Sequence, residues 1–339
     1  MTKSDIEKIL NEYSLGNLKD FNLILVGVSS ENYRIQTSQG LFFLKKHRKE
    51  ASKRLKSIER IEHLFNSHGF PIVCPIMNKA GKYYSIHENN YFVVYPFISG
   101  KSFKNGQAPL NAFSKLGVLL ANIHLLTKGG IKESYADVKV YFMPFNPEQI
   151  LEYINKHLDR ISHLDKKSAY DLQAEKGLFL KRDMITKFAP QFKKISFDKF
   201  NLGHGDYHLE NIFFDPQQNI SAVFDLDMAG PMPRMYELVR SIMISCFAHV
   251  YAEDRIIQAE AFIKAYYEKY PFEKDDFKKG MDTFYFKTFS TWRERAHYEE
   301  SDNRTDDEYP LTIESIKYLN DKRDYLVDRL YVYATSSGY

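Results

Sequence analysis

Short apolar and polar runs alternate along roughly the first hundred residues, and residues typical of turns separate them. This period-two pattern is typical of β-strands that are buried on one face. Between Ala51 and Ser67 the apolar positions instead recur at helical spacing, and Gly69 and Pro71 mark the end of that segment. The pattern predicts a small antiparallel sheet with one crossing helix. Strands are expected at residues 21–27, 33–37, 41–46, 82–87 and 91–97.

Beyond Ser99 and Gly100, apolar residues recur every three to four positions over long stretches, which predicts amphipathic helices. Helices are expected at residues 112–126, 147–164, 169–192, 235–250, 255–270 and 313–333. Strand signals in this half surround only residues 204–225. A chain of 339 residues exceeds what one core usually holds. We therefore expect two parts, an N-terminal lobe at residues 1–97 and a helical lobe at residues 98–339.

Composition narrows the function classes. The net charge of +3 is far below the basic excess of a dedicated nucleic-acid binder. No stretch has the roughly 20 apolar residues of a membrane span, and the N-terminus lacks the apolar centre of a signal peptide. Cys74 and Cys246 are far apart in apolar surroundings, which favours reduced, buried thiols. We expect a cytoplasmic protein with no membrane or nucleic-acid partner.

A motif rich in oxygen-bearing side chains occupies residues 204–211 and continues at residues 225–227. In kinase-type chemistry one Asp accepts the proton of the acceptor hydroxyl, an Asn five positions later holds Mg²⁺, and an Asp on the next strand holds a further Mg²⁺. Asp206, Asn211 and Asp225 fit these roles in that order. The motif therefore predicts Asp206 as the catalytic base and Asn211 and Asp225 as metal ligands.

A predicted hairpin explains how the two metal ligands meet. Residues 211–214 and 220–224 read as strands, and residues 215–219 form a turn by composition. A hairpin of this length brings Asn211 and Asp225 to the same end. Two hard oxygen ligands at the same end of a hairpin suit Mg²⁺, which keeps bound water molecules and takes further ligands from phosphates.

Other interpretations of these residues stay open. Residues 204–225 could form an ordinary surface hairpin, and His204 with His208 could bind zinc, although the intervening Gly205 favours a loop. Residues 223–227 resemble the strand-borne Asp pair of haloacid dehalogenase phosphatases, although Ala229 stands where those enzymes usually have Thr or Val. A kinase fold without activity, serving as a binding or structural protein, is a further alternative.

With the Asp206 and Asp225 motifs, the segment 119–124 and the strand that carries Lys45, the chain resembles the aminoglycoside phosphotransferase and choline kinase superfamily. The resemblance implies an α+β, bilobal, protein-kinase-like fold. It implies ATP and Mg²⁺ as cofactors and transfer of the γ-phosphoryl group to a hydroxyl of a small molecule. The acceptor could be an aminoglycoside, a sugar, an amino alcohol or a homoserine-like compound, and the protein a monomer or homodimer.

The resemblance also assigns residues around the nucleotide. Lys45 grips the phosphates and is steadied by a helix glutamate, for which Glu59 is preferred and Glu62 is the alternative. The loop at residues 27–32 covers the phosphates, and the linker at residues 95–97 binds adenine through its backbone. The remaining ATP-binding residues expected are Ser29, Ser30, Asn32, Tyr95 and Phe97. Supporting roles fall to His204, Asp227 and Glu237, whereas His124 is expected to be a packed core residue.

An aromatic segment with charged neighbours is the candidate acceptor site, because such a surface suits a polyhydroxylated ligand. Its residues are Trp292, Arg293, His297 and Tyr298. The same segment could be an amphipathic helix that packs Trp292 inward. The acidic residues at 299–308 form either a solvated loop or a landing site for a cationic acceptor.

Overall fold

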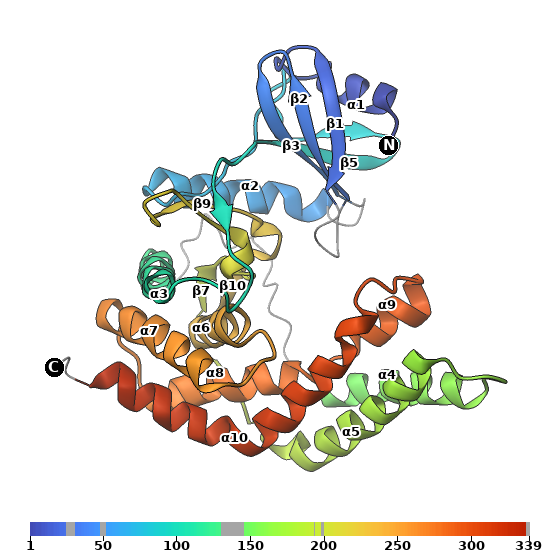
Figure 1. The fold of residues 1–339 in the computed structure, drawn as a ribbon, viewed down its shortest axis with the longest axis vertical. Coiled ribbons are helices and arrows are strands. Elements are labelled where there is room, and N and C mark those ends of the chain that lie inside the picture. Colours follow the sequence, from blue (N-terminus) through green and yellow to red (C-terminus); the bar gives the residue numbers. More distant parts are fainter. Residues whose placement is uncertain (25–30, 48–51, 130–145, 193, 198–199, 337–339) are drawn as a thin grey trace. The chain divides into compact units, whose positions relative to one another are not determined.

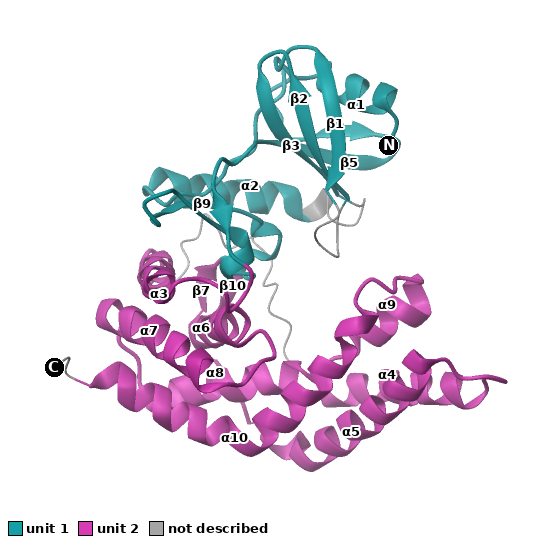
Figure 2. Cartoon of the chain, viewed as in Figure 1, with its two compact units in different colours: residues 1–103, 204–230 teal, residues 104–203, 231–339 magenta. Residues whose placement is uncertain are grey.

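The computed structural model describes residues 1–24, 31–47, 52–129, 146–192, 194–197 and 200–336. The chain divides into two compact units (Figures 1 and 2). Unit 1 contains residues 1–103 and 204–230, and unit 2 contains residues 104–203 and 231–339.

The main sheet of unit 1 has five strands in the order β1-β2-β3-β5-β4, and every neighbouring pair is antiparallel (Figure 1). In this register Lys45 on β3 lies between Asn32 on β2 and Val93 on β5. The predicted antiparallel sheet is confirmed. The strands are β1 (Leu18–Ile24), β2 (Glu31–Thr37), β3 (Gly40–His47), β4 (Ser85–His87) and β5 (Asn90–Pro96).

A short helix that the sequence pattern did not predict, α1 (Lys3–Leu10), covers part of this sheet. Thr2 begins it with a capping box, in which Thr2 and Asp5 satisfy each other's backbone N–H groups. Ile6 and Ile9 are buried in one core cluster with Ile35 of β2. Eight residues give too few turns for a helical period to stand out, so packing on the sheet accounts for most of the stability of α1.

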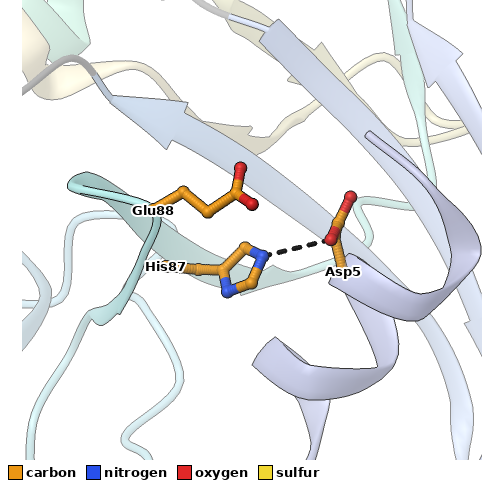
Figure 3. Close-up of side chains that lie close together, drawn as sticks. All are labelled: Asp5, His87 and Glu88. Atoms are coloured by element: carbon orange, nitrogen blue, oxygen red, sulfur yellow. Dashed lines mark hydrogen bonds and ion pairs between the residues drawn. The ribbon is translucent and has the colours of Figure 1, made fainter.

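Asp5 also joins α1 to the hairpin of β4 and β5. Its Oδ1 lies 3.2 Å from His87 Nε2, and Figure 3 shows Glu88 beside this pair. Asp5 Oδ2 accepts hydrogen bonds from the backbone and hydroxyl of Thr2. These contacts hold the pKa of Asp5 at about 2, chiefly through Thr2 and then through His87. The ionised carboxylate therefore fastens the N-terminal helix to the sheet.

The predicted helix is present as α2 (Ser52–Ser67). Leu55, Ile58 and Phe65 are buried along one face, and Glu62 is buried among them with 2% of its surface exposed. The helix ends before Gly69, whose φ of +80° is in the left-handed region that glycine tolerates best.

Residues 204–230 form the rest of unit 1. The predicted hairpin is present as β8 (Ile212–Phe214) and β9 (Ile220–Val223), and β6 (Lys101–Ser102) pairs with β8. Val223 exchanges backbone hydrogen bonds with the segment after α2, donating to Pro71 O at 2.7 Å and accepting from Val73 N at 3.0 Å. Because of these bonds, the hairpin lies in the same compact unit as the sheet, whereas the division expected from sequence assigned it to the helical part.

Unit 2 is mainly helical and contains most of a short pair of strands, β7 (Phe200–Gly203) and β10 (Gly230–Pro233). Six of its helices match predictions, although the one expected at 235–250 ends at Ile242 and continues as a π-helical turn, Met243–Phe247. Within the described ranges, no helix has the length and apolar character needed to cross a bilayer. The helices are α3 (Leu110–Leu125), α4 (Pro147–Ser162), α5 (Ala169–Phe192), α6 (Arg234–Ile242), α7 (Glu253–Lys269), α8 (Lys274–Lys287), α9 (Trp292–Glu300) and α10 (Tyr309–Thr335).

Candidate functional site

The β8–β9 hairpin brings Asn211 and Asp225 to one end, as its sequence predicts. Ile212 faces Val223 in the strand register, and Phe224 N donates to Asn211 O at 3.0 Å. Asn211 and Asp225 therefore leave the hairpin from neighbouring backbone positions.

The loop at residues 204–211 is braced by His204. Its Nε2 donates to Phe224 O at 3.0 Å, and its Nδ1 accepts from Asp206 N at 3.2 Å. Because both ring nitrogens are used by backbone groups, His204 is held as the Nε2–H tautomer and has no lone pair to offer zinc. The bracing role expected of His204 thus has a direct structural basis, and the zinc alternative does not.

Asn211 fixes the position of Asp206 within the same loop. Its Nδ2 donates to Asp206 O at 2.9 Å and lies 3.2 Å from His208 Nε2. The amide nitrogen is thereby occupied, whereas Asn211 Oδ1 makes no hydrogen bond to any described residue. The side chain is arranged to present its oxygen, which is the atom that binds a hard cation.

Lys45 connects the main sheet to the hairpin. Its Nζ, on a side chain that is 2% exposed, lies 2.8 Å from Asp225 Oδ1 and 2.9 Å from Asp227 Oδ2. Burial alone would lower the pKa of Lys45, but the carboxylates of Asp227 and Asp225 outweigh it and the pKa is raised. A permanent ammonium is therefore held beside two carboxylates.

The two aspartates next to Lys45 differ in how they are held. Asp227 also faces His47, whose Nδ1 lies 3.7 Å from Asp227 Oδ2. Burial would raise the pKa of Asp227, but Lys45 and His47 lower it, and the net direction is down. Asp225 is one third exposed and has a left-handed backbone, with φ 65° and ψ 66°. The two carboxylates are thus similarly exposed, at 34% and 26%, and differ mainly in that Asp227 also faces His47.

The two glutamates proposed as partners of Lys45 lie in different environments. Glu62 is buried and accepts a hydrogen bond from Tyr95 OH at 3.2 Å. Burial, followed by the charge of Asp227, raises the pKa of Glu62 to about 8, and Lys45 counteracts part of that rise. Glu59 is only partly buried, and the charges that act on it are those of His63, Lys56 and Arg60. Burial and the electrostatic effect of Lys45 favour Glu62, the alternative, over Glu59.

The structure describes some of the other residues that were expected to bind the nucleotide. Ser29 and Ser30 lie outside the described residues, and Asn32 lies on β2 opposite Lys45. The ring of Tyr95 is buried and faces Glu62. The backbone N–H of Phe97 donates to Leu41 O at 3.3 Å, so an adenine contact through this group must share or replace that bond.

In unit 2, Glu237 is the centre of a buried network that the sequence analysis only partly anticipated. Glu237 Oε2 lies 2.7 Å from His124 Nε2, and His124 Nδ1 lies 2.7 Å from Tyr266 OH. A Cβ atom at Gly203, directly before His204, would clash with the Glu237 carboxylate. His124 is buried, as expected, but it is also a hydrogen-bonding residue. The sequence feature that could have indicated this role is the position of His124, a polar residue, on the apolar face of α3.

The candidate acceptor residues of unit 2 lie on α9, and most of them form hydrogen bonds with other residues of the unit. Trp292 is 47% exposed, so the alternative in which it packs inward is wrong. The other three make polar contacts: Arg293 Nη2 with Glu308 at 2.8 Å, His297 Nδ1 with Asp306 at 2.7 Å, and Tyr298 OH with Asp171 at 2.7 Å. Glu308 and Asp306 belong to the acidic stretch, whose charge is therefore partly neutralised within the unit.

Sequence analysis missed a buried ion pair in the same unit. Lys181 Nζ lies 2.7 Å from Glu294 Oε1 and donates to Ser290 O at 2.9 Å, and Tyr309 OH donates to the same Glu294 oxygen at 2.7 Å. Lys181 and Glu294 are 1% and 0% exposed. The two residues are far apart in sequence, so no local pattern links them.

Comparison with known proteins adds independent information. A family model described as the phosphotransferase enzyme family matches residues 20–275. A homoserine kinase of Pseudomonas aeruginosa is 24% identical over 173 residues, which cover 49% of this chain and 54% of the relative. The chain thus spans about half the length of the curated relatives that it matches first.

Solved structures share the fold. A spectinomycin phosphotransferase in complex with ADP and spectinomycin superimposes with a TM-score of 0.69 at 16% identity, covering 98% of both chains. A microcompartment-associated aminopropanol kinase gives a TM-score of 0.64 at 12% identity, covering 97% of this chain and 100% of the other. These matches confirm the predicted kinase-like α+β class.

Proposed function

Because the chain belongs to the phosphotransferase enzyme family, we propose that it is a small-molecule kinase that transfers the γ-phosphoryl group of ATP to a hydroxyl group. One observation carries this proposal: unit 1 holds Lys45, Asp225 and the Asp206–Asn211 loop together through direct hydrogen bonds. A cation for phosphates, two oxygen ligands for a metal and a carboxylate base are the groups that phosphoryl transfer requires.

The side chains fit Mg²⁺ on chemical grounds. Asn211 Oδ1 and Asp225 Oδ2 are hard oxygen atoms that make no hydrogen bond within the described residues. Mg²⁺ prefers such ligands in small number and completes its shell with water and phosphate. Asn211 and Asp225 would hold the metal, which when bound neutralises charge on the phosphate oxygens.

The remaining groups position the substrates. Lys45 would bind phosphate oxygens with the ammonium that now faces Asp225 and Asp227. Asp206, which Asn211 and His204 hold through its backbone, would accept the proton of the acceptor hydroxyl. Since a loose transition state needs little bond-making from the protein, positioning and charge neutralisation would supply most of the acceleration.

We further propose that the acceptor is a small hydroxylated amine. Support comes from the relatives, which are named as kinases of homoserine and aminopropanol and a phosphotransferase of spectinomycin. The acidic stretch adds little support, because Asp306 and Glu308 already pair with His297 and Arg293. Homoserine and aminopropanol are therefore the first acceptors to test.

A coupled assay of ADP formation tests the proposal with purified full-length protein, ATP, Mg²⁺ and a panel of homoserine, aminopropanol, ethanolamine and spectinomycin. We expect ADP release that depends on one acceptor. Asp206→Asn should lower kcat by about a hundredfold or more with little change in ATP affinity. Lys56→Gln, which changes an exposed residue, serves as the control. Wild-type turnover by Asp206→Asn would contradict the role of Asp206. Release of phosphate from a simple phosphomonoester without nucleotide would indicate a phosphatase instead.

A further inference from the structure

Arg54 contacts the metal-site segment without belonging to any group that the proposed reaction uses. It lies in the first turn of α2, and its side chain is half-buried. Its guanidinium donates from Nη1 to the backbone oxygen of Asp227 and from Nη2 to the backbone oxygen of Ala229, the latter at 3.3 Å. One planar side chain thus binds two carbonyl groups, two and four positions after Asp225.

The segment that Arg54 grips is conformationally unfavourable. Asp225 has a φ of 65°, in the left-handed region that residues other than glycine rarely adopt. Such a conformation persists only when the surroundings hold it in place. After Asp225 the chain makes a tight turn, Leu226–Met228, closed by the bond from Ala229 N to Leu226 O at 2.9 Å. Arg54 holds the carbonyl groups at this turn.

Lys45 also restrains this segment, but its contacts would not be permanent in the proposed reaction. Its ammonium pairs with Asp225 and Asp227 at 2.8 and 2.9 Å. If Lys45 bound phosphate oxygens, these contacts would weaken, whereas Asp225 would be the residue that holds the metal. Arg54 binds backbone oxygen atoms, which neither the nucleotide nor the metal requires, so its grip is retained.

We propose that Arg54 is a positioning residue that keeps Asp225 in its left-handed conformation and thereby presents the carboxylate to Mg²⁺ independently of Lys45. This inference rests on the proposed function. It places the control of metal affinity on α2, through a guanidinium that donates to backbone oxygen atoms. A purely structural brace would change stability but not the dependence of nucleotide binding on Mg²⁺.

The test measures ADP binding to the full-length protein by isothermal titration calorimetry, once in EDTA and then over a series of Mg²⁺ concentrations. Arg54→Gln should raise the Mg²⁺ concentration for half-maximal enhancement of ADP affinity by about tenfold, because two hydrogen bonds from a charged group are lost. The affinity in EDTA should change less than about twofold. Lys56→Gln removes an exposed cation from the same helix and should match the wild type.

Arg54→Lys provides a second variant that keeps the charge. A lysine ammonium can reach one carbonyl but not grip two in a planar fork, so we expect an intermediate shift of about threefold. Should Arg54→Gln fail to fold, as judged by circular dichroism, Arg54→Lys decides the matter. Wild-type Mg²⁺ dependence in the folded variant would overturn the inference while leaving the kinase proposal intact. If the wild-type protein shows no Mg²⁺-dependent ADP binding, the proposed function fails, and this inference fails with it.

Discussion

Lys181→Met is expected to cause a large loss of stability, because it leaves a buried carboxylate without its cation. Glu294 is 0% exposed and Lys181 1% exposed, and their charged atoms are 2.7 Å apart. After the substitution the carboxylate keeps, among the residues that the structure describes, the hydrogen bond from Tyr309 OH. Removing one partner of a buried ion pair typically costs about 3 to 5 kcal/mol. We expect a decrease in the free energy of unfolding within that range.

An exposed pair of the same length provides the control. Lys156 Nζ also lies 2.7 Å from a carboxylate of α9, that of Glu299, but the lysine side chain is 63% exposed. Exposed ion pairs contribute about 0 to 1 kcal/mol, because water screens both charges. Lys156→Met should therefore change the free energy of unfolding by less than about 1 kcal/mol. Because the two ion pairs have the same length, the difference between the two variants measures the effect of burial on the stability of the pair.

The assay is equilibrium unfolding in urea, followed by the fluorescence of Trp292. This is the only tryptophan of the chain, and it lies two positions before Glu294 on α9. Glu294→Gln alone should also destabilise the protein, whereas Lys181→Met with Glu294→Gln should cost about 2 kcal/mol less than the sum of the single changes. A Lys181→Met variant within about 1 kcal/mol of the wild type would refute the reasoning, since it would mean that the carboxylate is already neutral or hydrated.

Three further predictions follow from unit 1 and the Glu237 network. Since Glu62 has its pKa raised to about 8, mainly by burial, the folded protein retains a proton that the unfolded chain releases, so the free energy of unfolding should fall as pH rises from about 4.5 to about 8. Glu62→Gln should flatten this dependence in urea titrations at several pH values; an unchanged slope would contradict the assignment. Gly205→Ala should lower the free energy of unfolding by about 2 kcal/mol or more, because Gly205 has a φ of +84° and a Cβ atom would clash with the Met228 carbonyl. An unfolding temperature equal to that of the wild type would contradict this prediction. Glu237→Gln should lower the free energy of unfolding by about 1 to 3 kcal/mol, because the hydrogen bond with buried His124 is weakened; an unchanged unfolding temperature in calorimetry would contradict this role.

Sequence patterns predicted those structural features that depend on residues close together in the chain. The hairpin that joins Asn211 to Asp225 needs only two apolar runs and a turn between them, and the structure has it. The Lys45 strand was likewise recognisable from local alternation. Both features are set by neighbours within a few residues, which the sequence displays directly.

Contacts between distant segments were not predictable in the same way. Arg54 reaches Ala229, and Lys181 reaches Glu294, across more than a hundred intervening residues. Nothing in the neighbourhood of either cation differs from an ordinary solvated helix. Such pairs become visible only when the packing of separate helices and strands is known.

The choice between Glu59 and Glu62 stays a prediction, but the helical phase of the sequence bears on it. Leu55, Ile58, Glu62 and Phe65 follow one another at intervals of three and four, so Glu62 falls on the apolar face of α2. A carboxylate on an apolar face requires a specific reason, such as an interior partner. Helical phase, rather than distance from Leu64, favours Glu62.

Unit 1 is built from two separate stretches of chain, and this affects how it folds during translation. Translation delivers the five-stranded sheet early, with Lys45 in an apolar interior, but the carboxylates that compensate its charge belong to Asp225 and Asp227. A nascent chain halted after Phe103 would have to leave that ammonium unpaired or keep the sheet open. We therefore expect the N-terminal segment to mature only after residue 230 has left the ribosome, and fragments that end earlier to be poor starting points for a minimal nucleotide-binding module.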